Sequence, residues 1–248
     1  MYVTKIMNYK KIYATQAEAY EQMITTEDYL GNLLPALQGI RPFHNQHVVE
    51  FGAGTGRLTC LLAPLVQQID ACEGAAHMLT VAQRKLEAGG WQNWHLHHAD
   101  NATLPLPDSC ADIAIEGWSF AHARGWFPDS WQQEIGNMLN EMKRVLKPGG
   151  TMILLETLGT GNESPAPPSS HLAELYLWWK ATYHLQSTWI RTDYQFRSPE
   201  EGANLTRFFF GDELADRILA ERLTILPECT GIWWQTIESP AKGAVKTR

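Results

Sequence analysis

Cysteine is scarce in this chain of 248 residues, and its four cysteines lie far apart without forming a Cys-x-x-Cys pair. They are Cys60, Cys72, Cys110 and Cys229. This spacing favours neither a disulfide framework nor a zinc site, and reduced thiols in a cytoplasmic protein are the simpler interpretation. The neighbouring His95, His97 and His98 are joined by no further cluster of ligands, so we expect no bound metal.

Long apolar runs and an excess of positive charge are also missing. No segment approaches the about 20 apolar residues of a membrane-spanning helix, and the N-terminal MYVTKIMNYKK lacks the apolar region of a signal peptide. The chain has 20 Lys and Arg against 27 Asp and Glu, and its net charge of −7 disfavours a nucleic-acid partner. Tryptophan is abundant instead, and its 10 residues offer broad amphipathic contact surface.

Short apolar segments typical of strands alternate with amphipathic segments typical of helices between residues 47 and 157. This alternation predicts βαβ units and an α/β fold, with helices on both faces of a doubly wound parallel sheet. The expected strands are 47–51, 68–73, 94–99, 111–116 and 151–157, and the helices between them are 57–63, 75–87 and 131–146. Further helices are expected before residue 40 and at 172–183, and further strands at 192–196 and 232–237.

A glycine-rich turn, Gly52-Ala-Gly54-Thr-Gly56, follows the first expected strand and precedes a helix. Such a turn lets a ligand approach the backbone, and the helix N-terminus adds free N–H groups and positive potential. The G-x-G-x-G spacing differs from the G-x-G-x-x-G of dinucleotide-binding folds, and Arg57-Leu58 stands where a Walker loop needs Lys-Ser/Thr. The turn therefore predicts a bound ligand without identifying it.

An acidic residue, Glu73, closes the second expected strand. A carboxylate at this position can accept hydrogen bonds from both hydroxyls of a ribose, although an exposed strand-end acid without a ligand is the alternative interpretation. The segment continues as Glu73-Gly-Ala-Ala-His-Met78-Leu79. Two later segments are Asp100-Asn-Ala-Thr-Leu-Pro-Leu-Pro-Asp108 and Arg144-Val-Leu-Lys-Pro-Gly-Gly150, and each precedes an apolar strand.

Together with the glycine-rich turn, these segments give four motifs in order across residues 47–157. In this order they resemble class I S-adenosylmethionine-dependent methyltransferases, in particular the small-molecule subgroup that includes quinone-biosynthesis enzymes. The resemblance implies a Rossmann-like, mostly parallel seven-stranded sheet. It also implies an N-terminal helical cap (1–40), a cofactor-binding core (41–160), an inserted helical cap after strand five (161–191), C-terminal strands and a helix (192–239) and a tail (240–248).

The resemblance also implies roles for individual residues. Glu50 and the glycine-rich turn would hold the methionine part of the cofactor, Glu73 its ribose, and Asp100 with the Asn101 backbone its adenine. Glu116, Gly117 and Trp118 would line the methyl-transfer site, and Tyr13 and Tyr20 are candidates to close over the cofactor. The expected cofactor-binding residues are Glu50, Gly52, Ala53, Gly54, Gly56, Glu73, Met78, Asp100, Asn101, Glu116, Gly117 and Tyr20.

Methyl transfer is an in-line displacement that needs an aligned, dry site more than it needs fixed catalytic groups. For an acceptor that must lose a proton, His122 is the candidate base and Glu116 a weaker second, although an ordinary loop histidine is an alternative. The expected substrate wall comprises Trp118, Trp178, Trp179 and Trp189, with Tyr183 and Tyr194 beside them. Core packing is the alternative for Tyr176 and Trp179, which follow a helical stripe.

The leading hypothesis is a cytoplasmic S-adenosylmethionine-dependent methyltransferase that acts on a small, apolar or aromatic molecule and forms a homodimer through an exposed aromatic patch. One alternative is a catalytically silent protein that binds the cofactor as a sensor or assembly partner. Another is a nicotinamide-dependent oxidoreductase, which the glycine spacing and the Lys-Pro-Gly-Gly segment argue against.

Overall fold

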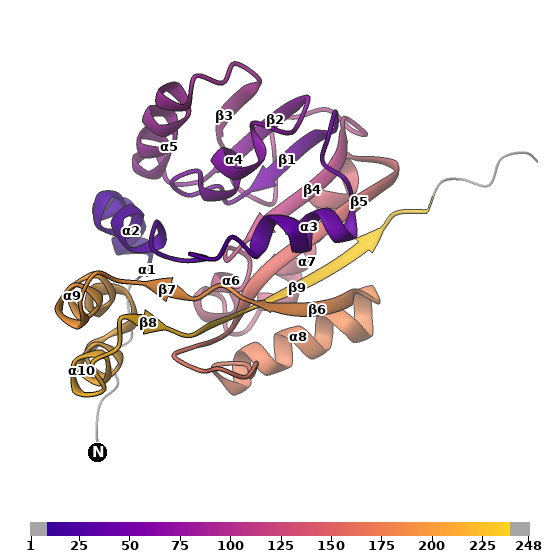
Figure 1. Cartoon of the computed structure of the whole chain (residues 1–248). Helices are drawn as coiled ribbons and strands as arrows, with labels where there is room; N and C mark the ends of the chain where they lie inside the picture. Colours follow the sequence, from indigo (N-terminus) through magenta and orange to yellow (C-terminus); the bar gives the residue numbers. More distant parts are fainter. Residues whose placement is uncertain (1–8, 239–248) are drawn as a thin grey trace, which may run out of the picture.

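A seven-stranded sheet forms the centre of the computed structural model, which describes residues 9–238. Its order is β3-β2-β1-β4-β5-β9-β6 (Figure 1). The strands are β1 (His47–Phe51), β2 (Gln68–Glu73), β3 (Trp94–His98), β4 (Ala111–Gly117), β5 (Leu146–Thr160), β6 (Gln186–Arg191) and β9 (Glu228–Thr236). β9 runs antiparallel to β5 and β6, and the other neighbours run parallel. The expected mostly parallel seven-stranded sheet is therefore confirmed.

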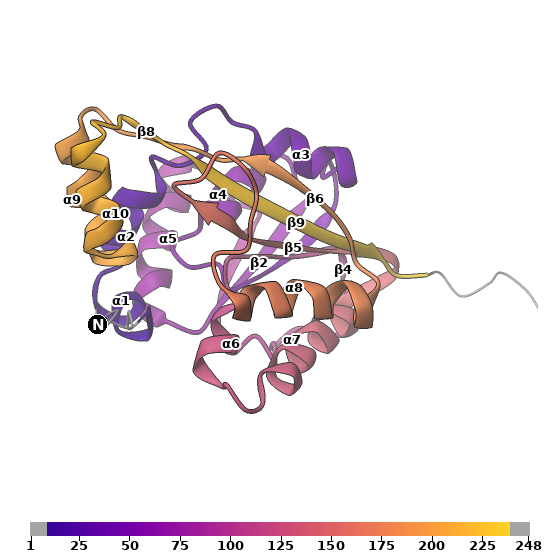
Figure 2. The ribbon, with the colours of Figure 1, turned by 90° about the horizontal axis from the view of Figure 1, so that it is seen from below.

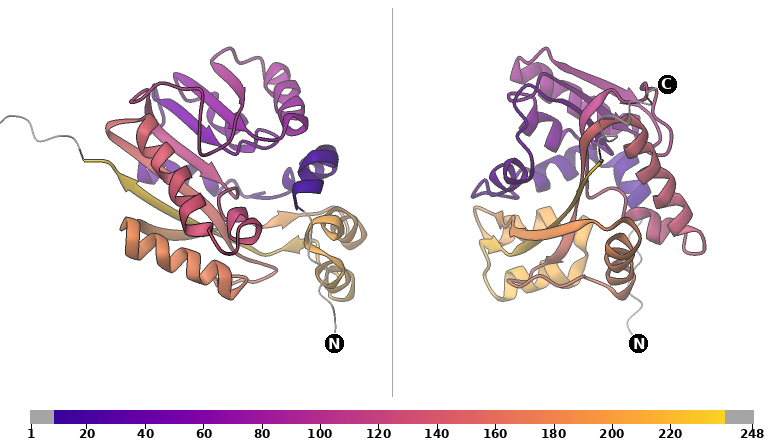
Figure 3. Two further views of the ribbon diagram at one scale, coloured as in Figure 1. Left: turned by 180° about the vertical axis from the view of Figure 1, so that it is seen from behind. Right: turned by 90° about the vertical axis from the view of Figure 1, so that its right-hand side faces the viewer.

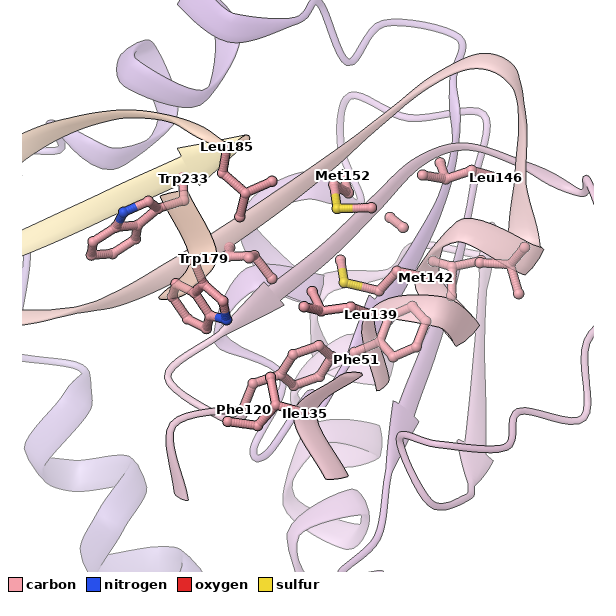
Figure 4. Close-up of a cluster of buried hydrophobic side chains, with 14 of the residues drawn as sticks. Phe51, Phe120, Ile135, Leu139, Met142, Leu146, Met152, Trp179, Leu185 and Trp233 are labelled. Atoms are coloured by element: carbon pink, nitrogen blue, oxygen red, sulfur yellow. The ribbon is translucent and has the colours of Figure 1, made fainter. Parts of the chain in front are cut away.

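Helices cover both faces of the sheet because successive strand residues point their apolar side chains to opposite faces. Val48 packs on the face covered by the helices α3 (Leu33–Ile40), α4 (Arg57–Leu62) and α5 (Ala76–Gly89). Phe51 packs on the opposite face, covered by α6 (His122–Trp126), α7 (Trp131–Val145) and α8 (Ser170–Tyr183). Figure 2 shows α6, α7 and α8 on one side of the sheet, and Figure 4 shows Phe51, Ile135 and Trp179 as parts of one core cluster on that side.

Two N-terminal helices, α1 (Tyr9–Thr15) and α2 (Ala17–Ile24), lie between α5 and the pair α9 (Pro199–Phe210) and α10 (Asp212–Ala220) (Figure 3). Ala17 packs with Met78 of α5, and Met23 packs with Ala203 and Ile218 of the helix pair. These contacts bring the N-terminal helices and the pair α9 and α10 together over the edge of the sheet at which the glycine-rich turn leaves β1. Residues 1–8 of the expected N-terminal cap lie outside the described range.

The segment expected as a cap at 161–191 contributes mainly to the sheet and its covering layer. A helix, α8, does follow strand five, but its Leu175 and Trp179 are completely buried in the core beneath it. Strand β6 follows α8, and its polar sequence QSTWIR concealed it because an edge strand need not be apolar. The helices α9 and α10, which pack against the N-terminal helix α2, are inserted in the chain between β6 and β9 instead (Figure 1).

The strand expected at 192–196 is shortened to β7 (Tyr194–Gln195), which pairs with β8 (Ile225–Leu226) in a separate two-stranded sheet. The tail expected at 240–248 lies outside the described residues. All four cysteines are free. Across residues 9–238, no helix combines the length and the apolar character that crossing a membrane requires.

Candidate active site

The glycine-rich turn between β1 and α4 has a backbone that requires glycine. Gly52, Gly54 and Gly56 have φ values of 64°, 56° and 78°, in the left-handed region that residues with a Cβ rarely adopt. A Cβ on Gly52 would lie 2.0 Å from the Ser119 hydroxyl oxygen. At Gly54, by contrast, the nearest atom would be the Met78 methyl carbon at 3.6 Å. The turn is therefore closely packed beneath Gly52 and more open at Gly54.

Glu73, at the end of β2, turns its carboxylate toward this glycine-rich turn. One oxygen accepts a hydrogen bond from the Gly54 N–H at 2.8 Å, and the other accepts one from the Ala75 N–H at 2.7 Å. Burial raises the pKa of Glu73, while these backbone N–H groups oppose that rise. Each carboxylate oxygen keeps a second lone pair, so the group can also accept hydrogen bonds from a ligand.

The loop after β3 reaches the same turn through Asn101 rather than through Asp100. Asp100 is exposed and accepts a hydrogen bond from the Ala102 N–H at 2.8 Å. The Asn101 amide nitrogen donates to the Ser119 hydroxyl at 3.0 Å, beside Gly52. Its amide oxygen is buried and has no partner within residues 9–238. An unsatisfied buried acceptor costs about 1–3 kcal/mol, so this oxygen is suited to accept a hydrogen bond from a ligand.

Three further predicted residues stabilise the glycine-rich turn through contacts inside the protein, namely Glu50, Ala53 and Met78. Glu50 is buried and accepts a hydrogen bond from the Thr59 hydroxyl of α4 at 2.6 Å. Burial raises the pKa of Glu50 to about 8. The Ala53 N–H donates to the Cys72 carbonyl at 2.9 Å, and Met78 is buried behind Gly54. Glu50 thus ties β1 to α4, a contact different from the expected one with the cofactor.

Two buried carboxyl groups fix the loop between β4 and α6. Glu116 accepts a hydrogen bond from the Ser119 N–H at 3.1 Å, and Glu156 of β5 accepts one from the Ala121 N–H at 2.9 Å. Burial raises the pKa of both groups, and that of Glu156 rises to about 8. Between them Trp118 is held at φ 54°, a conformation that is uncommon for a residue other than glycine. A Cβ on Gly117 would lie 2.9 Å from the end of the Leu58 side chain, which would have to shift.

A cavity of about 370 Å³ lies beside this loop, between the N-terminal helices, α9 and the ends of β5 and β9. Aromatic side chains dominate its wall: Tyr9, Tyr13, Tyr20, Trp118, Trp126, Tyr194, Phe209 and Phe210. The polar lining includes Glu27, Arg57, His122, Arg124, Glu156 and Glu228. The cavity adjoins the glycine-rich turn because Trp118 lines it while the next residue, Ser119, contacts Gly52.

His122 stands in the aromatic wall of this cavity. Its Nε2 atom lies 2.7 Å from the Tyr13 hydroxyl oxygen, and its ring stacks on Trp126 with centroids 5.2 Å apart. Enclosure by these groups lowers the pKa of His122 to about 4, so the imidazole is neutral at neutral pH. A neutral imidazole can accept a proton, and the Tyr13 contact fixes its orientation.

Three of the four tryptophans expected in the substrate wall lie away from the cavity. Trp178 packs edge-on against Trp131 at 5.2 Å, and Trp179 is completely buried against Trp233. Trp189, on the edge strand β6, is 44% exposed and lines a separate groove. Of the expected aromatic residues, Trp118, Tyr13, Tyr20 and Tyr194 are brought together in the cavity wall.

Several cavity residues were missed by the sequence reasoning. Arg57 follows the last glycine of the turn directly, and Trp126 lies one helical turn after His122, so local spacing could have indicated both. Phe209, Glu27 and Glu228 come from distant parts of the chain and only folding brings them together.

The three histidines considered as metal ligands take part in other contacts or stand apart. The Nε2 atom of His97 lies 2.7 Å from one carboxylate oxygen of Asp70, and that of His47 lies 2.6 Å from the other. The Nε2 atom of His98 is hydrogen-bonded to the Gly74 carbonyl. Within the described range, 9–238, no group of three or more histidine, cysteine or acidic residues is arranged to hold a metal ion.

Comparison with known proteins bears on the central part of the chain. Residues 49–154 match a family described as a methyltransferase domain. The chain is 32% identical over 111 residues to the uncharacterized protein YafE of Escherichia coli K12, across 45% of this chain and 49% of YafE. It is 33% identical over 117 residues to a demethylmenaquinone methyltransferase of Symbiobacterium thermophilum, across 44% of this chain and 42% of that enzyme. The chain thus spans about half the length of the curated relatives it matches.

Comparison with solved structures bears on the fold. A SAM-dependent methyltransferase from Aquifex aeolicus shares the fold with a TM-score of 0.54 at 16% identity, across 87% of this chain and 97% of that one. The sequence matches confirm the resemblance to methyltransferases that the four motifs indicated, and this structure shows the likeness in fold.

Proposed function

We propose that this chain, which carries a methyltransferase domain over residues 49–154, uses S-adenosylmethionine and methylates a small, apolar or aromatic molecule. One observation carries the proposal: the glycine-rich turn faced by Glu73 is joined to an aromatic cavity through Trp118 and Ser119. A donor site beside an acceptor cavity is the arrangement that methyl transfer between two small molecules requires.

The residues around the glycine-rich turn fit the proposed cofactor. The Glu73 carboxylate, with free lone pairs on both oxygens, would accept the ribose hydroxyls. The buried, unpartnered amide oxygen of Asn101 (among residues 9–238) would accept an N–H group of the adenine. The open side of Gly54 leaves room for the methionine part beside the N–H groups at the start of α4. Glu50 would act by holding the turn rather than by touching the cofactor.

The cavity would supply alignment and exclusion of water. When bound, the cofactor provides a methyl group that its positively charged sulfur has already activated. The aromatic wall replaces water around the acceptor and restricts its orientation toward Trp118, at the junction with the donor site. The left-handed backbone of Trp118, stabilised by Glu116 and Glu156, fixes that junction before the substrates bind.

For an acceptor that must lose a proton, His122 is the proposed base. It lines the cavity, Tyr13 orients it, and its imidazole is neutral at neutral pH and thus able to accept a proton, but its lowered pKa makes it a weaker base than an exposed histidine. Glu116 is completely buried and bonded to the backbone of its own loop, so we propose a positioning role for it in place of the proton transfer first considered.

The alternative functions lack a supporting observation of this kind. A sensor that only bound the cofactor would need no second, aromatic cavity beside it. The G-x-G-x-G turn and the sequence matches both favour a methyl donor over a nicotinamide dinucleotide. Homodimer formation, a cytoplasmic location and the absence of a nucleic-acid partner stay predictions from the sequence.

Calorimetry tests the cofactor directly. S-Adenosylmethionine and S-adenosylhomocysteine should both bind the wild-type chain, and Glu73→Ala should weaken both at least about tenfold because two hydrogen bonds to a carboxylate are lost. Glu87→Ala, which changes an exposed acid on α5, is the matched control and should bind as wild type does. Binding of a nicotinamide dinucleotide without binding of S-adenosylmethionine would refute the proposal.

Turnover is tested by incubating the protein with S-adenosylmethionine carrying a radiolabelled methyl group and a library of small aromatic and apolar acceptors. The proposal expects label in at least one acceptor and less of it with His122→Asn when the acceptor atom carries a proton. Tight cofactor binding with no labelled acceptor across the library would instead favour the silent sensor.

A further inference from the structure

One end of the aromatic cavity carries a polar cluster formed by Glu27, Arg57 and Glu228. The Arg57 guanidinium lies 4.3 Å above the Trp118 ring, and its Nη1 donates to a Glu27 carboxylate oxygen at 2.7 Å. Glu228, at the start of β9, is 2% exposed and accepts a hydrogen bond from the Thr157 hydroxyl at 2.8 Å. The polar cluster therefore borders the proposed methyl-transfer site through Trp118.

Two atoms of this cluster are buried and lack a partner among residues 9–238. They are Nη2 of Arg57, which can only donate a hydrogen bond, and Oε2 of Glu228. Their side chains are close enough to interact electrostatically, and the Thr160 hydroxyl lies beside the same carboxyl group. Each unsatisfied buried polar atom is unfavourable, so the pair is suited to a polar group that binds both atoms at once.

The charges around the cavity disfavour an ionic ligand at this point. Arg57 is already paired with Glu27, and Arg124 is paired with Glu174, which does not line the cavity. A carboxylate bound by Arg57 would face the carboxyl groups of both Glu27 and Glu228. An ammonium group bound by Glu228 would face the Arg57 guanidinium, and Glu228 offers it little negative charge at neutral pH because burial raises the pKa of this carboxyl group to about 8. Either arrangement places like charges together in a buried site, which is unfavourable.

We propose that the polar cluster anchors an uncharged hydroxyl group of the acceptor molecule, whose oxygen accepts a hydrogen bond from Arg57 Nη2 and exchanges one with Glu228 Oε2. A hydroxyl is the simplest group that both donates and accepts at one atom, so it satisfies Glu228 whether that carboxyl group is protonated or ionised. The apolar part of the molecule then lies against the aromatic wall, with Tyr20 and Phe209. This inference rests on the proposed function, because it describes the acceptor of the same site.

Four naphthalene derivatives test the anchor with one common scaffold: naphthol, methoxynaphthalene, naphthoate and naphthylmethylammonium. Each is titrated into the full chain saturated with S-adenosylhomocysteine. Naphthol should bind about tenfold more tightly than methoxynaphthalene, which cannot donate, and more tightly than either charged probe. Tightest binding by a charged probe, equal binding of naphthol and methoxynaphthalene, or binding by none of the four would overturn the proposal.

Substitution of Glu228 separates an anchor from a structural residue. Glu228→Gln keeps a donor and an acceptor and should retain the preference for naphthol, whereas Glu228→Leu should reduce the naphthol-to-methoxynaphthalene ratio to about one. An unchanged ratio in Glu228→Leu would overturn the proposal. If that variant does not fold, Arg57→Met, which removes the donor to the acceptor oxygen, should weaken the binding of both naphthol and methoxynaphthalene, and unchanged binding of naphthol there would overturn the proposal as well.

Titration of S-adenosylhomocysteine alone distinguishes a failure of the hydroxyl anchor from a failure of the proposed function. Cofactor binding with no preference for naphthol would remove the anchor and leave the proposed function intact. A preference for naphthol, measured without the cofactor in a chain that fails to bind it, would support the anchor and refute the proposed function.

Discussion

Gly52→Ala is expected to be the most damaging single change in the glycine-rich turn. An alanine there would retain a φ of 64°, which costs about 1–2 kcal/mol for a residue with a Cβ. Its Cβ would also lie 2.0 Å from the Ser119 hydroxyl oxygen and 2.5 Å from the Ser119 Cβ, so the loop after β4 must move. Overpacking of this kind costs about 1–3 kcal/mol, and we expect a total loss of about 2–5 kcal/mol.

Two matched controls separate these contributions in urea unfolding experiments. Gly90, at the end of α5, has a φ of 75° and open space around it, so Gly90→Ala should lose only the backbone part, about 1–2 kcal/mol. In a Ser119→Gly background the clash is absent, so Gly52→Ala should there cost only the backbone part, about 1–2 kcal/mol relative to Ser119→Gly alone. A loss in Gly52→Ala no greater than that in Gly90→Ala would refute the packing argument.

The remaining predictions concern titration and the core. The pKa of Glu156 rises from 4.5 to about 8 on folding, so the free energy of unfolding of the wild type should fall as pH increases from about 4.5 to 8. Glu156→Gln should flatten that decline, and identical pH profiles of the two proteins would contradict the raised pKa of Glu156. The pKa of His122 falls from 6.5 to about 4 on folding, so the stability contributed by the neutral imidazole is present above pH 6.5 and is lost as pH falls toward 4. His122→Asn should reduce this loss of stability in acid when unfolding is measured across the same pH range. Trp179→Ala should lower the free energy of unfolding by about 3–5 kcal/mol because the side chain is completely buried. Trp189→Ala, at a 44% exposed position, should lower it by less than about 1 kcal/mol, and similar losses in the two variants would contradict the burial of Trp179.

The cofactor half of the molecule could be predicted from the sequence because its determinants are local. A strand, three closely spaced glycines and a helix fix the turn, and the end of the neighbouring parallel strand must then place Glu73 beside it. The strands at 47–51 and 68–73 have the expected bounds, and the interior of each is buried.

The acceptor half could not be predicted in the same way. Its cavity combines Tyr9, Arg57, Phe209 and Glu228, which are far apart in the chain and share no spacing rule. The abundance of tryptophan did not indicate which residues face a ligand, because large aromatic side chains also stabilise cores, as Trp179 does. Strand β6 was missed because a polar edge strand lacks the apolar pattern of its buried neighbours.

A structure of the chain in complex with S-adenosylhomocysteine tests the central claim most directly. The ribose hydroxyls should bind Glu73, the methionine part should lie along Gly54, and the sulfur should face the aromatic cavity beside Trp118. A ligand bound elsewhere, or one whose sulfur points away from that cavity, would contradict the central claim.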